Sequence, residues 1–115
     1  MNKMILEDPP NPAKIISKKL TKTDLARNMK LPKQQTKSVV TMMNGGTTET
    51  LHVGKEVKIL DYIEGHEYTV ILRCTDNGKY NFGDGWNTMK NSLNLQEGEI
   101  LSLYWDYRNQ QFIII

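Results

Sequence analysis

The sequence has few of the features that mark secreted, membrane-spanning or disulfide-bonded proteins. Its single cysteine, Cys74, cannot form an internal disulfide, and no Asn-x-Ser/Thr glycosylation acceptor occurs. No apolar run approaches the roughly 18 residues that a membrane-spanning helix needs, and residues 1–12 lack the basic and then apolar pattern of a signal peptide. These absences predict a soluble protein of a reducing, intracellular compartment.

Residue types that support catalysis or metal binding are also sparse and scattered. His52 and His66 have no further ligand at the spacing of a metal site, so each is predicted to lie at the surface. The segment Gly83-Asp84-Gly85 lacks the remaining spacing of a dinucleotide-binding or phosphate-binding loop. The carboxylates are dispersed along the chain. We therefore expect no enzyme activity, no metal or other cofactor and no small-molecule substrate.

The size and composition of the chain suit one domain with an ordinary core. It has 115 residues, of which 38% are hydrophobic. Three of its four prolines lie within residues 9–12, and proline can neither continue a helix nor join a central strand. We predict that residues 1–13 form a flexible lead-in and that residues 14–115 form the domain.

Short stretches of alternating apolar and polar side chains, separated by turn residues, predict a mainly β fold. The clearest pattern is a hairpin in which residues 57–61 and 68–73 flank a turn at Glu64-Gly65. Further strands are expected over residues 14–19, 80–82, 100–106 and 112–115, within a total of seven. Strands and turns at such regular spacing are typical of a barrel or a sandwich.

Two short helices are expected among these strands. One covers residues 33–43, and the other covers residues 86–92 with Asp84 as its cap. The side-chain oxygens of Thr21 and Asp24 predict a loop or a single helical turn after the first strand. Residues 41–56 include a polar loop, rich in glycine and threonine, that shows no strong local preference.

Charge is unevenly distributed along the chain, although its net value is only +2. Residues 1–40 carry nine basic and three acidic side chains, whereas residues 41–72 carry two basic and five acidic ones. Between residues 18 and 33, six cations accompany a single acid, Asp24. Such a cluster is the electrostatic footprint of a surface that binds nucleic acid, and it also occurs on ordinary solvated surfaces.

Four motifs in a fixed order resemble the plant B3 DNA-binding domain. They are Lys19-Leu20-Thr21-Lys22-Thr23-Asp24-Leu25, Leu31-Pro32-Lys33, Gly83-Asp84-Gly85-Trp86 and Leu95-Gln96-Glu97-Gly98-Glu99. The resemblance spans residues 14–115, and in detail the sequence looks like the divergent reproductive-meristem and related branches of flowering plants. Residues 41–56 have no counterpart that aligns.

The resemblance implies an open seven-stranded pseudobarrel with two short helices. It also implies that two loops clasp the major groove of double-stranded DNA, in a transcription factor that works in the nucleus. One loop follows the first strand, and the other joins the fourth strand to the fifth. In this sequence they correspond to a first arm, residues 18–33, and a second arm, residues 73–81.

The side chains of both arms suit contacts with DNA. Arginine pairs bidentately with guanine and asparagine with adenine, so the candidates for reading bases are Arg27, Arg73, Asn77 and Asn81. Lysine and threonine suit phosphate contacts that set the register. The candidates for that role are Lys18, Lys19, Thr21, Lys22, Thr23, Lys30, Lys33, Thr75 and Lys79.

Simpler structural roles compete with contact at some positions. Asn77-Gly78 is an ideal turn dipeptide, and Asp24 suits a helix cap or the orientation of a basic neighbour. Asp76 and Asp84 place negative charge near the second arm. Large apolar side chains are expected in the core or barrel wall, namely Trp86, Trp105, Tyr104, Phe112 and Val70.

Two other functions remain open at this point. The domain could be a protein-interaction barrel that has lost DNA binding. It could also be a barrel that binds RNA or single-stranded nucleic acid, which requires exposed aromatic side chains for stacking on bases. Tyr80 is the one aromatic residue in the two arms.

Overall fold

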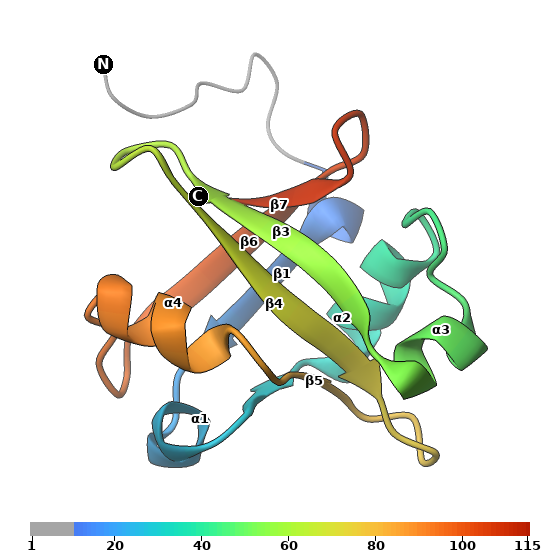
Figure 1. Ribbon diagram of the computed structural model, residues 1–115, viewed down its shortest axis with the longest axis horizontal. Helices are drawn as coiled ribbons and strands as arrows, with labels where there is room; N and C mark the ends of the chain where they lie inside the picture. The colour runs from blue at the N-terminus through green and yellow to red at the C-terminus, as the bar shows by residue number, and fades with distance from the viewer. Residues whose placement is uncertain (1–10) are drawn as a thin grey trace.

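Seven strands form one curved sheet in the computed structural model, which describes residues 11–115 (Figure 1). The strands are β1 (Ile15–Lys19), β2 (Met29–Leu31), β3 (Lys55–Asp61), β4 (His66–Cys74), β5 (Tyr80–Phe82), β6 (Ile100–Asp106) and β7 (Gln111–Ile114). The helices are α1 (Lys22–Ala26), α2 (Lys33–Val40), α3 (Thr48–Val53) and α4 (Trp86–Ser92), with a 3₁₀ turn, η1, at Pro12–Lys14. Residues 1–10 of the expected lead-in lie outside the described residues.

The strand order is β1-β6-β7-β3-β4-β5-β2, so β1 and β2 are the two edges of the sheet. All neighbouring strands are antiparallel except β3 and β7, which are parallel. β7 therefore joins the β1–β6 pair to the remaining four strands. This arrangement confirms the predicted seven-stranded open pseudobarrel.

Alternate residues of the strands point into one hydrophobic core. In the hairpin of β3 and β4, Val57, Ile59, Val70 and Leu72 are all buried. Trp86, Trp105, Phe82 and Phe112 are the largest buried side chains, and the rings of Trp105 and Phe112 meet edge to face at 4.9 Å. The predicted core positions are confirmed for Trp86, Trp105, Phe112 and Val70, and Tyr104 is half-buried in the wall.

The helices agree with the sequence in part. α2 and α4 lie where two helices were predicted, and α1 is the single turn expected after the first strand. The prediction of a polar loop within residues 41–56 is wrong for α3, because Thr47 caps that helix by accepting the Thr50 amide and Leu51 anchors it in the core. The prediction that Asp84 caps α4 is also wrong, since the N-cap is Gly85 and no side chain bonds to the first turn.

Candidate nucleic-acid interface

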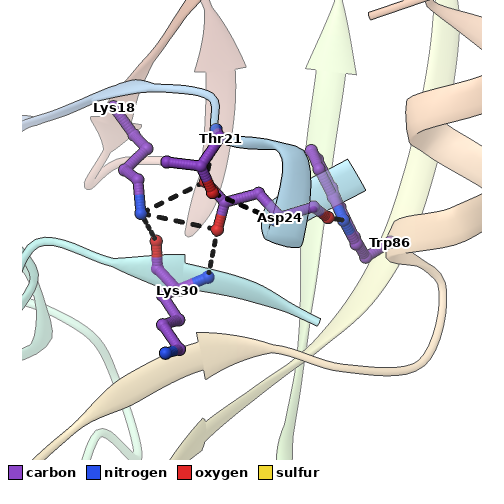
Figure 2. A network of polar contacts seen from close by, with 5 residues as sticks. All are labelled: Lys18, Thr21, Asp24, Lys30 and Trp86. Atoms are coloured by element: carbon purple, nitrogen blue, oxygen red, sulfur yellow. Dashed lines mark hydrogen bonds and ion pairs between the residues drawn. The ribbon is translucent and has the colours of Figure 1, made fainter. Parts of the chain in front are cut away.

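The first arm is organised around the buried carboxylate of Asp24. Its Oδ2 accepts the Thr21 amide at 2.9 Å, while the Thr21 hydroxyl accepts the Asp24 amide at 3.1 Å, so the two residues form a capping box at the start of α1. The Lys18 ammonium lies 3.3 Å from Oδ2 (Figure 2). The expected capping role of Asp24 is confirmed.

The same carboxylate reaches the exposed side of edge strand β2. Asp24 Oδ1 accepts the Lys30 amide at 3.1 Å, and Lys18 Nζ donates to the Lys30 carbonyl at 2.8 Å (Figure 2). Both backbone groups of Lys30 that face away from β5 are therefore satisfied by side chains. We refer to Lys18, Asp24 and Lys30 as the edge clasp, because it connects the two open edges of the sheet.

Burial by itself raises the pKa of Asp24, because desolvation disfavours the charged form. Hydrogen bonds from the Thr21 and Lys30 amides, from the Thr21 hydroxyl and from Lys18 outweigh this effect, so the pKa lies below its ordinary value. The carboxylate is therefore charged at neutral pH and holds the Lys18 ammonium beside it.

Helix α4 fastens the first arm to the core. The indole nitrogen of Trp86 donates to the Asp24 carbonyl at 2.8 Å, and Lys90 Nζ donates to the Leu25 carbonyl at 2.6 Å. Gly85 permits this placement, because a Cβ atom there would collide with the Thr69 carbonyl oxygen of β4 and the residue has φ +90°. The Gly83-Asp84-Gly85-Trp86 motif thus positions the α4 side chains that hold α1 in place.

The second arm ends in a tight turn. The Gly78 amide donates to the Thr75 carbonyl at 2.9 Å, and the Thr75 and Lys79 backbones are joined at 2.8 Å. The Thr75 hydroxyl bonds to the Asn77 side chain and accepts the Lys79 amide, so Thr75 and Asn77 both stabilise the turn. His52 of α3 lies 3.7 Å from Asp76 at the tip.

A row of polar side chains crosses strands β4, β5 and β2, where the two arms adjoin. Arg73 of β4 is paired with Asn81 of β5, and Asn81 is paired with Lys30 of β2. Their strand neighbours Leu72, Phe82 and Met29 are buried in the core, so alternation places the three polar side chains on the outer face. Helix α1 of the first arm and the loop between β4 and β5 of the second arm lie at the same end of the molecule (Figure 1).

Three adjoining depressions follow this surface from one arm to the other. Arg27 and Asn28 line the first two, and Lys30 and Asn81 line the second and third. Their lining contains four basic side chains and one carboxylate. They are Arg27, Lys30, Lys33, Lys79 and Asp84. The surface between the arms is therefore concave and positively charged.

The structure brings many of the predicted residues together and assigns internal bonds to some. Those that line the depressions are Thr23, Arg27, Lys30, Lys33, Thr75, Lys79 and Asn81. Lys19 and Lys22 are exposed but do not line these depressions, and the hydroxyl of Thr21 caps α1. The ammonium of Lys18 belongs to the edge clasp, and its side chain is 20% exposed.

Asn28 lines the first two depressions beside Arg27, although it was not among the predicted site residues. An amide side chain next to an arginine, just before a strand of the first arm, was the available signal. His52 and His66 are exposed as predicted. Between residues 11 and 115, no helix is long and apolar enough to cross a membrane, and no cluster of three His, Cys, Asp or Glu residues could hold a metal ion.

The fold defines a class of protein, the open seven-stranded pseudobarrels. A protein-family model described as the C-terminal domain of B3 domain-containing protein At5g26805 matches residues 15–115. The chain therefore belongs to the B3 domain family, as its motifs predicted.

Individual relatives are consistent with this assignment. The chain is 53% identical to the B3 domain-containing protein At1g43171 of Arabidopsis thaliana over 103 residues, which cover 90% of this chain and 92% of that protein. It is 52% identical to the putative B3 domain-containing protein At1g50220 of the same plant and spans about half of its length, 51%, and 90% of this chain. The Arabidopsis FUS3–DNA complex contains a similar fold, with a TM-score of 0.63 at 22% identity over 85% of this chain and 91% of that one.

Proposed function

We propose that this domain binds double-stranded DNA as the DNA-binding part of a plant transcription factor. The two arms enter the major groove, and the row between them faces the DNA. The observation that carries the proposal is the excess of basic side chains, four against one carboxylate, that lines the adjoining depressions. The solved relative FUS3 is a complex with DNA, which supports the same partner for this fold.

The proposed contacts divide by chemistry. Arg27, Arg73 and Asn81 read base edges, and Asn77 does so from the tip of the second arm. Lysine and threonine side chains of both arms contact phosphates and set the register, namely Lys19, Lys22, Thr23, Lys30, Lys33 and Lys79. Lys18, Thr21 and Thr75 assist mainly by holding the arms, because their polar groups bond within the domain.

The rest of the proposed function follows from this role. The domain acts by positioning, without chemistry of its own, without a cofactor and without a small-molecule substrate. Transcription factors act on chromosomal DNA, so we expect the protein in the nucleus. We place residues 14–115 in the DNA-binding unit, since the sheet begins at Ile15 and ends at Ile114.

The proposal is tested by charge reversal with a matched control. Arg27→Glu with Lys30→Glu changes the depressions, whereas Lys58→Glu with Arg108→Glu makes the same change in net charge on β3 and on the β6–β7 turn. We expect the first pair to weaken duplex binding by at least about 100-fold at moderate salt and the second pair by less than about fivefold. Fluorescence anisotropy with a labelled duplex measures both.

The salt dependence of binding provides a second readout. Each phosphate contact that is lost should lower the slope of log affinity against log salt by roughly one. Equal losses in both double variants would mean that net charge alone drives binding. If the folded wild-type domain does not bind duplex DNA, the protein-interaction barrel is favoured. If the domain prefers single strands and Tyr80→Ala removes that preference, the single-strand alternative is favoured.

A further inference from the structure

Arg73 occupies an unusual position between two glycine backbones. A Cβ atom at Gly54, the residue between α3 and β3, would lie 3.0 Å from Arg73 Nε and 3.2 Å from Nη2. A Cβ atom at Gly83, just after β5, would lie 3.2 Å from Nη1. The guanidinium is therefore flanked on both sides by peptide backbone, in space that other residues would fill.

Within residues 11–115, the flanked guanidinium has no polar partner. Arg73 is half-buried, and none of the ion pairs or side-chain hydrogen bonds found among residues 11–115 involves it. A partly desolvated cation with five donors gains strongly from an acceptor that supplies the missing bonds. Asn81, Lys30 and the depression lined by Gly83, Arg27 and Asn28 lie on the same surface.

We propose that Gly54 and Gly83 are positioning residues that hold the Arg73 guanidinium in one orientation, so that it reads a single base pair by a bidentate contact. The inference rests on the proposed DNA binding and adds a specificity determinant to it. A planar fork that is already fixed loses less conformational freedom on binding than a mobile one. It also accepts fewer alternative bases, because a rotated guanidinium no longer matches the two acceptors of guanine.

Residues 41–56 contribute to holding Arg73 through Gly54. Helix α3 ends at Gly54, whose φ of +115° is accessible to glycine and costly for other residues. This segment, which the four sequence motifs do not include but which lies within the family match over residues 15–115, thus forms one wall of the Arg73 site. Through His52 and Asp76 it also touches the second arm.

Gly83→Ala is the informative substitution. Gly83 does not have a positive φ, so alanine fits its backbone, and the Gly83 amide that donates to the Ile71 carbonyl at 2.8 Å is kept. The new methyl group would lie 3.2 Å from Arg73 Nη1, so the guanidinium has to shift by a few tenths of an ångström from its position between the two glycines. Gly54 is unsuitable for this test, because substitution there strains the backbone itself.

The experiment is a double-mutant cycle on a duplex selected by the wild-type domain from a random pool. We expect Gly83→Ala to weaken binding at least about fivefold and Arg73→Ala between roughly fivefold and 150-fold. Adding Gly83→Ala to Arg73→Ala should change affinity by less than about twofold, because the effect passes through Arg73. Thermal unfolding and amide NMR spectra check that each variant is folded.

Arg73→Lys separates orientation from charge. Lysine keeps the cation and lacks the fork, so we expect affinity for random duplex to be kept and the preference at one base pair to be lost in this variant and in Gly83→Ala. The positioning role would be overturned if Gly83→Ala weakened duplex binding as much in the Arg73→Ala background as in the wild type. An unchanged base preference in Gly83→Ala would also overturn it. A wild-type domain that binds no duplex would overturn the proposed function and the role of Arg73 with it.

Discussion

At the scale of single residues, Asp24 shows how a buried charge can hold several segments in place. A carboxylate in a protein interior is costly unless its oxygens are bonded, and each oxygen of Asp24 accepts a backbone amide. The residue thereby fixes the start of α1, the exposed side of β2 and the Lys18 ammonium. A single carboxylate inside the basic first arm thus helps to fix the positions of the basic residues around it.

Because of these bonds to Asp24, the free energy of unfolding should fall as the pH is lowered. The pKa of Asp24 is lowered by folding, so its contribution is complete above the ordinary carboxyl pKa and is lost as pH falls through the lower folded value. We expect Asp24→Asn to reduce the free energy of unfolding by about 2 kcal/mol at pH 7. The difference from wild type should shrink below about pH 4, the range in which free Asp titrates. Urea unfolding at several pH values measures it, and a gap that widens on acidification would contradict it.

At the scale of elements, the turn that opens α4 depends on a close approach of two backbones. Gly85 and Gly65 both have positive φ, but a Cβ atom at Gly65 meets nothing within 4 Å, whereas one at Gly85 collides with Thr69 of β4. We expect Gly65→Ala to cost about 1 kcal/mol, from backbone strain alone. Gly85→Ala should cost at least about 3 kcal/mol, because the clash displaces the turn that holds Trp86.

Chemical denaturation of the two alanine variants tests this comparison. Circular dichroism reports the fold, and tryptophan fluorescence reports the combined surroundings of Trp86 and Trp105. Equal losses of stability in both variants would mean that φ alone sets the requirement for glycine at Gly85.

The elements also show which features could be read from the sequence. Strands β3, β4 and β6 can be recognised from alternating apolar and polar residues, because one face of each strand is buried. β2 has three residues, which are too few for an alternating pattern to place a strand. Helices α1 and α3 have five and six residues, too few for a helical period, and they are specified by the caps at Thr21 and Thr47.

The candidate interface was predictable to a similar degree. The clustering of cations in the first arm indicated a charged surface, and the structure gathers Arg27, Lys30 and Lys33 along it. Asn28 was missed, and the internal bonds of Lys18 and Thr75 could not be foreseen, because they depend on which side chains meet after folding. The glycine walls beside Arg73 likewise exist only in the folded chain.

At the scale of the whole molecule, an open sheet has two edges that need protection. The edge clasp connects them through side chains, so the first arm and β2 should open together when it fails. In Asp24→Asn we expect amides of residues 21–31 to exchange with solvent at least about tenfold faster at pH 7, while those of β3, β4, β6 and β7 keep their rates. Hydrogen–deuterium exchange measures this, and uniform acceleration would show global destabilisation instead.

The central position of β7 in the sheet affects how the domain folds during synthesis. Gln111–Ile114 is the last strand of the sheet to leave the ribosome, yet it is the one that links β1 and β6 to the others. Until it emerges, the nascent chain holds two incomplete sheet fragments with apolar faces open to chaperones. A premature stop codon just ahead of Gln111 would remove β7 and leave two pieces that cannot close into one barrel.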